Sequence, residues 1–251
     1  MITGSLSILG CRVDAVDTAA AVDLIGGWLN ERRAAHVVTF GAEMAALAAR
    51  DGRYRDAINA ADLVVPDTVG VIWASGVLGH RLPERVAGID LVDRVLETYA
   101  SRGLRLFVLG ASAGVAESAA QLLATRYEGV VIAGMHHGYF AADHDDDVAR
   151  LVRSANANLL LVALGFPNQE YWIRDNLHAV GGAVCIGVGG ALDVWAGRAA
   201  RAPAAWRRLG LEWLYRLLRE PNRFRRQLAL PRFVVLVLAQ ALRGPTANPR
   251  T

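Results

Sequence analysis

The sequence predicts an α/β fold: a mostly parallel sheet with helices on both faces, followed by a basic helical appendage at the C-terminus. Short apolar runs alternate with segments of helical periodicity along residues 17–188, as in a parallel sheet connected by helices. The run over 158–164 is almost wholly apolar, which is typical of a strand buried on both faces. After Trp195 arginine dominates the charged residues. We therefore expect an α/β domain over residues 1–197 and an Arg-rich helical appendage over residues 198–251.

The first half of the chain begins with a predicted edge strand or hairpin over residues 5–15, after which predicted helices and strands alternate. Helices are predicted where apolar residues recur every three or four positions, and strands where a short apolar run lies between turn residues. The predicted strands are 36–40 and 63–66, and the predicted helices are 17–32, one that ends at residue 50, 53–61, 68–78 and 89–101. A polar loop over 79–88 leads into the last of these helices.

In the second half of the chain, predicted strands and helices alternate more regularly. Its predicted strands are 104–109, 130–133, 158–164 and 183–188, and its predicted helices are 114–127, 143–154 and 165–180. A loop that contains glycines and two histidines is expected over 134–140. Together with the first half, this order predicts a Rossmann-like arrangement.

The charges divide the chain into two unlike parts. Residues 1–197 carry 15 Arg against 22 acidic residues, a net charge of −7. Residues 198–251 carry 12 Arg against 2 acidic residues, a net charge of +10. A strongly basic segment of this kind indicates an anionic partner, which can be a phosphate group, a nucleic acid or a membrane surface.

The basic segment is predicted to be helical over 205–219 and again from Pro221, because proline is tolerated in the first turn of a helix. If the chain stays helical across Pro221, four arginines share one face and apolar residues occupy the other. These arginines are Arg216, Arg219, Arg223 and Arg226. The pattern fits an amphipathic segment on an anionic membrane, and it fits nearly as well a docking helix with a solvated basic face.

Several features indicate a cytoplasmic protein. No secretory signal opens the chain, and the apolar stretch 233–242 is about half of the roughly 20 residues that span a bilayer. Cys11 and Cys185 lie far apart beside apolar neighbours and show no CxxC spacing. We expect both to be buried free thiols in a reducing compartment.

Several reaction classes lack their motifs. A nicotinamide dehydrogenase needs G-x-G-x-x-G after its first strand, but the glycines within 110–114 are spaced differently, and 187–190 lacks the third glycine. The chain contains no lysine, so no Walker loop is present, and no G-x-S-x-G supports a nucleophilic serine. The glycines of both stretches can still bring backbone amides close to a phosphate.

A metal site is poorly supported, and we expect no metal and no cofactor. His136 and His137 are adjacent, so on a strand they point to opposite faces. Residues 145–147 match a D-x-D pattern that can hold a metal-bound diphosphate. They fit better as the acidic first turn of a helix, which the helix dipole favours.

Asp67 is the candidate general base. It follows the apolar strand 63–66, and ligands of α/β proteins bind at the carboxyl ends of parallel strands. A carboxylate at that edge can take the proton of an attacking hydroxyl group. The competing interpretation is that Asp67 only caps the following helix, and taken alone this interpretation is the stronger one.

Other polar residues are expected at the ends of strands, where they suit a ligand with several hydroxyl groups. With Asp67, the set comprises Thr39, Glu43, Arg85, Gln169, Glu170 and Asp193. Each member alone fits a cap or a loop residue. If the ligand is a glycosyl diphosphate, cationic side chains stabilise the departing diphosphate, and the Arg-rich segment can supply them.

A series of motifs runs through about residues 5–230 in a defined order. In the body they are Thr39-Phe40 with Glu43, 61–67 with Gly70, 84–91, 137–140, 165–170, and 188–190 with Asp193. In the appendage they are 201–203, 212–216, and Glu220-Pro221 with Arg223. Taken together, the motifs resemble those of the WecG/TagA/CpsF glycosyltransferases of bacterial cell-surface polysaccharide synthesis.

The resemblance implies an inverting, metal-independent enzyme that uses a UDP-sugar, commonly UDP-N-acetylmannosamine or its uronate. The implied acceptor is a sugar on undecaprenyl diphosphate at the inner face of the membrane, where the appendage contacts the surface. Nucleic acid is not expected as a partner, and a homo-oligomer is compatible with the pattern.

By position, Asp67 resembles the family's base, and Thr39 is expected beside the sugar as a second catalytic residue. The expected substrate-binding residues are Arg85, Gly110, Gly165, Gln169, Glu170, Gly189, Arg216, Arg223 and Arg226.

Two positions depart from the family pattern. Gly41 stands where members often have asparagine, and Thr68 stands where many have glycine. Without the asparagine amide, an expected contact to the sugar is missing, so the donor sugar is not fixed. A UDP-linked glucose or galactose is an alternative. The alternative from a different class is a non-catalytic nucleotide-sugar-binding module in which Asp67 is only a cap.

Overall fold

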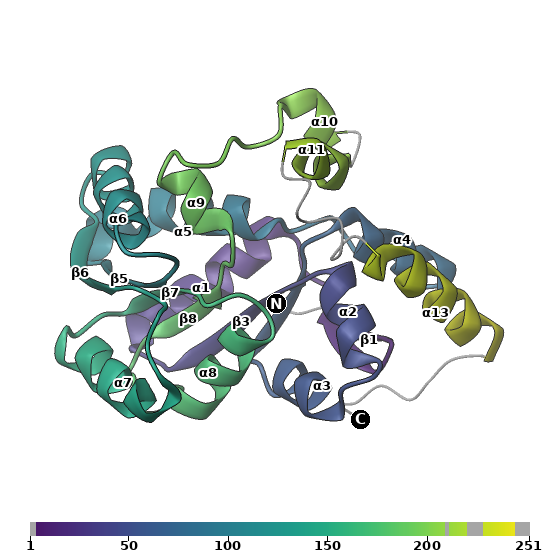
Figure 1. Ribbon diagram of the computed structural model, residues 1–251, viewed down its shortest axis with the longest axis horizontal. Coiled ribbons are helices and arrows are strands. Elements are labelled where there is room, and N and C mark those ends of the chain that lie inside the picture. Colours follow the sequence, from purple (N-terminus) through teal and green to yellow (C-terminus); the bar gives the residue numbers. More distant parts are fainter. Residues whose placement is uncertain (1–3, 209–210, 220–227, 244–251) are drawn as a thin grey trace.

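The computed structural model describes residues 4–208, 211–219 and 228–243, which form a hairpin and a sheet surrounded by helices (Figure 1). The strands are β1 (Ser5–Ile8), β2 (Cys11–Asp14), β3 (Ala35–Phe40), β4 (Leu63–Pro66), β5 (Arg105–Gly110), β6 (Val131–His136), β7 (Leu159–Ala163) and β8 (Val184–Gly187). The first nine helices are α1 (Thr18–Glu31), α2 (Ala42–Ala48), α3 (Gly52–Asn59), α4 (Val69–Val77), α5 (Gly88–Tyr99), α6 (Val115–Arg126), α7 (Asp145–Ser154), α8 (Asn168–Asn176) and α9 (Ala191–Trp195). Then follow α10 (Ala204–Arg208), α11 (Glu212–Arg219) and α13 (Ala229–Arg243). The short 3-10 helices are η1 (Ala100–Arg102) and η2 (Ala142–His144).

The main sheet is parallel and has the strand order β4-β3-β8-β7-β5-β6. This confirms the predicted α/β class. Strands β1 and β2 form a separate antiparallel hairpin in which Ser5 pairs with Asp14. Because the six strands run in one direction, all their carboxyl ends lie at the same edge of the sheet.

Successive side chains of each strand point to opposite faces, and the two faces carry different helices. Val37 and Val65 belong to a core shared with α1, α5, α6 and α9. Val38 and Phe40 belong to the opposite core, which the hairpin, α2, α3, α4 and α13 complete. Helices α7 and α8 cover β5, β7 and β8 on that second face. The sheet is therefore sealed on both faces, and a ligand must approach it at an edge.

Strand β6 is longer than the predicted strand 130–133, and the predicted loop over 134–140 is wrong for its first three residues. Gly134, Met135 and His136 continue the parallel pairing with β5 after a register shift. A Cβ atom on Gly134 would lie 2.6 Å from the ring of Phe107. The glycine is thus required for close packing against β5, although its sequence context indicates a turn.

The C-terminal helices differ in how they meet the body of the protein. The predicted helix over 205–219 comprises two described helices, α10 and α11, which contact each other through Trp206 and Tyr215. Helix α13 lies alongside α4 and α2 (Figure 1). Its Gln240 side chain accepts a hydrogen bond from the Leu9 amide and donates one to the Ser7 carbonyl. Within the described ranges, no helix is long and apolar enough to cross a membrane.

Candidate functional site

The carboxyl ends of β4, β3 and β8 bring three predicted site regions together. Asp67 directly follows β4, and its amide donates a 3.0 Å hydrogen bond to the carbonyl of Phe40 at the end of β3. The Thr39 hydroxyl donates a 2.9 Å hydrogen bond to the carbonyl of Gly187 at the end of β8. Asp67, Thr39 and the loop after β8 therefore lie next to one another, as their positions at strand ends predict.

Asp67 is held by the start of α5. Its Oδ1 accepts a 2.9 Å hydrogen bond from the amide of Gly88, the first residue of that helix. Gly88 also lies against Thr39, since a Cβ atom on it would come within 2.8 Å of the threonine methyl group. The interpretation of Asp67 as the cap of the following helix is wrong: the N-cap of α4 is Thr68, and Asp67 instead bonds the first residue of α5. This bond fixes the carboxylate beside Thr39.

Gly41 and Thr68, the two departures from the family pattern, are neighbours in space. A Cβ atom on Gly41 would lie 3.2 Å from the methyl group of Thr68. The Thr68 hydroxyl accepts a 3.3 Å hydrogen bond from the amide of Ala42 in the first turn of α2. Gly41 is the N-cap of α2 and has no side chain to accept such a bond. Thr68 therefore fills the space beside Gly41 and supplies the capping oxygen from another segment.

The start of α8 adds Gln169 and Glu170 to this edge. The Gln169 amide nitrogen donates to Glu170 Oε1 at 2.8 Å, and its amide oxygen accepts from the Gly189 amide at 3.2 Å. Gln169 thus lies against the loop after β8. The Glu170 side chain is 1% exposed, and its Oε2 accepts a 3.1 Å hydrogen bond from the Tyr54 hydroxyl of α3. Its carboxylate lies behind Gln169 rather than at the open edge.

Burial sets the protonation of the Glu170 carboxyl group. Burial raises the pKa of Glu170 to about 7, while the hydrogen bonds from Gln169 and Tyr54 act in the opposite direction. Burial, and then the nearby Glu170 carboxylate, raise the pKa of Tyr54 well above its usual range. Tyr54 lies outside the predicted set because its place in an apolar helix face indicates only a core role.

Of the three predicted glycines, Gly110 is the last residue of β5, and Gly165 and Gly189 lie in the loops after β7 and β8. Gly110 has φ +126, Gly165 has φ +73 and Gly189 has φ +47, values that favour glycine. At Gly110 the space is also closed, because a Cβ atom would lie 2.4 Å from the carbonyl oxygen of Ala163. With strands about 4.8 Å apart, Gly110 lies roughly 19 Å across the sheet from Asp67. The edge is therefore long enough for an extended nucleotide-sugar.

Arg85 joins this edge to the C-terminal part of the chain. The adjacent Val86 amide donates to the carbonyl of Pro66 at 2.9 Å, which holds the loop beside the end of β4. The Arg85 guanidinium lies 3.7 Å from the carboxylate of Glu212 in α11. Both side chains are largely buried, so α11 is positioned close to the loop that carries Arg85.

The three expected appendage arginines are only partly covered by the structure. Arg216 belongs to α11, but its side chain is outside the description, and Arg223 and Arg226 lie outside the described residues. Their roles stay predictions. A second link ties the chain before α10 to the body, because Arg201 donates to Asp90 of α5 at 2.5 Å.

Among the described residues, the acidic and histidine side chains form no metal cluster. Residues 145–147 form the first turn of α7, which confirms the helix-start interpretation of that acidic run. His136 ends β6, and its ring lies 4.7 Å from that of His137 in a tilted arrangement, so the two rings are neighbours rather than on opposite faces. No group of three or more potential metal-binding side chains occurs among residues 4–208, 211–219 and 228–243.

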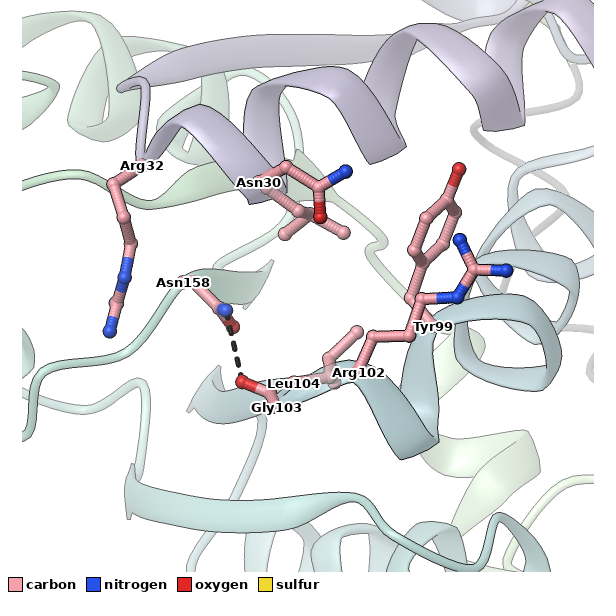
Figure 2. A pocket seen from close by; sticks show the side chains of 8 residues that line it. Asn30, Arg32, Tyr99, Arg102, Gly103, Leu104 and Asn158 are labelled. Atoms are coloured by element: carbon pink, nitrogen blue, oxygen red, sulfur yellow. Dashed lines mark hydrogen bonds between the residues drawn. The ribbon is translucent and has the colours of Figure 1, made fainter.

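A cavity of about 230 Å³ lies at the opposite edge of the sheet (Figure 2). It is lined by residues next to the amino ends of β5 and β7, including Leu104 and Asn158. The Asn158 amide spans the gap to the carbonyl of Gly103 (Figure 2). Since none of the predicted site residues lines this cavity, it is separate from the edge that carries Asp67.

Comparison with known proteins gives one consistent result. The family model described as "Glycosyl transferase WecG/TagA/CpsF family" matches residues 6–247. A protein of Bacillus spizizenii named N-acetylglucosaminyldiphosphoundecaprenol N-acetyl-beta-D-mannosaminyltransferase is 34% identical over 226 residues, which cover 90% of this chain and 87% of that protein. Proteins with the same name from Bacillus subtilis and Staphylococcus aureus are 33% identical over 223 and 234 residues. They cover 89% and 92% of this chain and 86% and 91% of their own lengths.

Proposed function

Because the chain belongs to the glycosyl transferase WecG/TagA/CpsF family, we propose that it transfers N-acetylmannosamine from a UDP-sugar to N-acetylglucosaminyl-diphosphoundecaprenol. Its relatives identify it as a hexosyltransferase of cell-wall polysaccharide synthesis. The observation that carries the proposal is the convergence of Asp67, Thr39 and Gln169 at one edge of the sheet. The names of the relatives supply the donor sugar and the acceptor.

In the proposed reaction Asp67 acts as the general base. Its carboxylate takes the proton from a hydroxyl group of the acceptor sugar, and that oxygen attacks the anomeric carbon of the donor. The bond between the anomeric carbon and the diphosphate oxygen breaks, and its electron pair leaves with UDP. Because attack and departure occur on opposite faces of the carbon, the configuration inverts. The Gly88 amide holds Asp67 in one orientation for this step.

Donor binding would use the neighbouring strand ends. Thr39 and Gln169 lie beside the loop after β8. We assign them the contacts to the sugar and its diphosphate. The loops of Gly110, Gly165 and Gly189 allow backbone amides to approach phosphate oxygens closely. Arg85 and the appendage arginines would stabilise the charge that develops on the leaving UDP.

The acceptor carries a long lipid, so we include the inner membrane surface among the partners. The charge of the C-terminal segment, 12 Arg against 2 acidic residues, favours an anionic surface. Helix α13 adds an outward apolar face, on which Val235 is 65%, Leu238 is 45% and Leu242 is 90% exposed. We therefore place the enzyme as a peripheral protein at that surface, where it can reach the lipid-linked sugar.

The test is a UDP-release assay with a lipid-linked N-acetylglucosaminyl diphosphate acceptor and a panel of UDP-sugars, with and without EDTA. We expect release with UDP-N-acetylmannosamine that depends on the acceptor and persists in EDTA. A preference for UDP-glucose or UDP-galactose would change the donor. Loss of activity in EDTA would contradict metal independence. Binding of UDP without any release would favour the non-catalytic binding module.

A further inference from the structure

Glu170 is a buried carboxylate, and among the described residues no ion pair involves it. Its side chain is 1% exposed, and its bonded partners are the Tyr54 hydroxyl and the Gln169 amide, both neutral. No ion pair joins it to an arginine within the described parts of the chain. Burial of a carboxylate under these conditions is costly, and an apolar side chain of similar size fills a core at lower cost. The acid at this position therefore calls for a role beyond packing.

The bonds of Glu170 determine which way the Gln169 amide points. In the observed orientation the amide nitrogen faces Glu170, and the amide oxygen faces the amide hydrogen of Gly189. A rotation by 180° would place the amide oxygen against the carboxylate and the NH₂ group against the Gly189 amide. The contact with Gly189 would then pair two donors, and the contact with an ionised Glu170 would pair two acceptors. Glu170 thus selects one of the two orientations.

Gly187 shows how closely this group fits the end of β8. A Cβ atom on Gly187 would lie 2.6 Å from Gln169 Nε2 and 3.3 Å from Glu170 Oε1. The carbonyl of the same residue accepts the hydrogen bond from Thr39. A continuous series of contacts therefore runs from Tyr54 through Glu170 and Gln169 to the strand ends that carry the site.

We propose that Glu170, held by Tyr54, is a positioning residue that fixes the Gln169 amide and the loop of Gly189 for binding of the donor diphosphate-sugar. This inference rests on the proposed function. Glu170 does not touch the donor and acts only through Gln169. Its loss should therefore weaken donor binding and leave the chemical step nearly unchanged, and it should have no further effect once the Gln169 amide is removed.

The test is a double-mutant cycle in the full-length protein. The single variants are Glu170→Ala, Tyr54→Phe and Gln169→Ala, and the double variant combines Glu170→Ala with Gln169→Ala. Glu170→Gln is the conservative variant, because its amide can still accept from Gln169 and pair with Tyr54. Tyr171→Phe is the matched control, since it removes a neighbouring hydroxyl group that is bonded to Asp51. Thermal unfolding of each variant checks folding.

We expect Glu170→Ala and Tyr54→Phe to raise the donor KM by about fivefold to tenfold with kcat within about twofold of the wild type. Glu170→Gln and Tyr171→Phe should keep a KM near the wild-type value. In the Gln169→Ala background, Glu170→Ala should add no further change. If Glu170→Ala does not fold, the donor KM of Tyr54→Phe is compared with that of Glu170→Gln instead.

The inference is overturned by additive effects of Glu170→Ala and Gln169→Ala, or by an unchanged donor KM in the folded Glu170→Ala and Tyr54→Phe variants. Such results leave the proposed function intact as long as the wild type transfers sugar. If the wild type shows no transfer, the proposed function fails instead. In that case calorimetric titration measures the UDP affinity of the wild type and of Tyr54→Phe. Equal affinities would overturn the inference.

Discussion

At the scale of single residues, the candidate site depends on short contacts between strand ends. Asp67 bonds Gly88, Gly88 lies against Thr39, and Thr39 bonds the carbonyl of Gly187. Each contact joins segments far apart in the sequence. A change in one side chain should therefore affect activity through orientation as well as through chemistry.

The first prediction concerns Asp67. Asp67→Asn keeps an oxygen that can accept from the Gly88 amide but removes the group that takes the proton. We expect transfer to fall by about 10²-fold to 10⁴-fold, the usual contribution of a general base, while UDP affinity changes little. Steady-state UDP release and calorimetric UDP binding measure the two effects. Asp23→Asn, on the exposed side of α1, is the control, and near-normal turnover of Asp67→Asn would rule out the base assignment.

The second prediction concerns the pair Gly41 and Thr68. Gly41→Asn places a Cβ atom 3.2 Å from the Thr68 methyl group, and Thr68→Gly removes the oxygen that caps α2. Each change should lower the free energy of unfolding by about 1 kcal/mol. In the double variant the new asparagine gains space and can cap α2 itself, so we expect less than the sum of the two losses. Urea unfolding measures this coupling, and strictly additive losses would mean that the two positions are independent.

The third prediction concerns the pH dependence of stability. Burial raises the pKa of Glu170 from 4.5 to about 7, so between these pH values the folded protein holds a proton that the unfolded chain has released. Stability from this group is therefore greatest at the acid end and is lost as the pH rises toward 7. The loss is on the order of 3 kcal/mol.

Glu170→Gln removes this titration while keeping the neutral amide contacts to Gln169 and Tyr54. Its free energy of unfolding should fall less between pH 5 and pH 8 than that of the wild type. Denaturant unfolding at both pH values measures the difference. Glu31→Gln, an exposed change at the end of α1, should follow the wild type. An equal fall for Glu170→Gln and wild type would show that Glu170 does not titrate in this range.

At the scale of elements, α13 has two different apolar faces. Phe233 and Val237 are buried in the core formed with α2 and α4, and Gln240 bonds the β1–β2 hairpin. Val235, Leu238 and Leu242 point outward and are exposed. A helix that is apolar on both sides gains stability when a second surface covers it. The proposed cover is the membrane that carries the lipid-linked acceptor.

The fourth prediction tests that face. Replacing Val235 and Leu238 together by glutamate should lower binding to phosphatidylglycerol-rich vesicles by about tenfold, because apolar contact is lost and like charges repel. Cosedimentation with vesicles measures the binding. Leu122→Glu, at a 49% exposed leucine on α6, is the matched control. Unchanged binding of the α13 variant would assign its outward face to something other than the membrane.

At the scale of the whole molecule, the C-terminal part is joined to the body at both ends. Arg201 bonds Asp90, Glu212 pairs with Arg85, and α13 packs on α2. The acidic body and the basic C-terminal part are therefore held together beside the candidate site. Removal of residues 201–251 should abolish both transfer and vesicle binding, but it also uncovers the core beneath α13. Point variants in the full chain separate these effects.

The fifth prediction uses such variants. Arg223→Ala combined with Arg226→Ala removes two cations that we expect at the leaving diphosphate. Transfer should fall by at least about tenfold, because loss of such a stabilising group commonly costs 10²-fold or more. Thermal unfolding should stay close to that of the wild type, and Arg232→Ala on the exposed side of α13 serves as the control. Full transfer by the double variant would show that these arginines do not complete the site.

The sequence alone was sufficient for the parallel α/β class, most element positions and the placement of Asp67, Thr39 and Gln169 at one edge of the sheet. These features follow from local patterns: apolar periodicity, turn residues, and the rule that parallel strands end at one edge. The extent of β6 was missed, because Gly134 packs against Phe107, and a packing glycine looks like a turn glycine in sequence.

Only the tertiary structure decided which residues touch. It showed that Asp67 bonds the first turn of α5, that Thr68 fills the space beside Gly41, and that Tyr54 and Glu170 lie behind Gln169. It also joined Arg85 to Glu212, which are far apart in the chain. Contacts of this kind depend on strand order and on the packing of helices against the sheet, neither of which a local pattern contains.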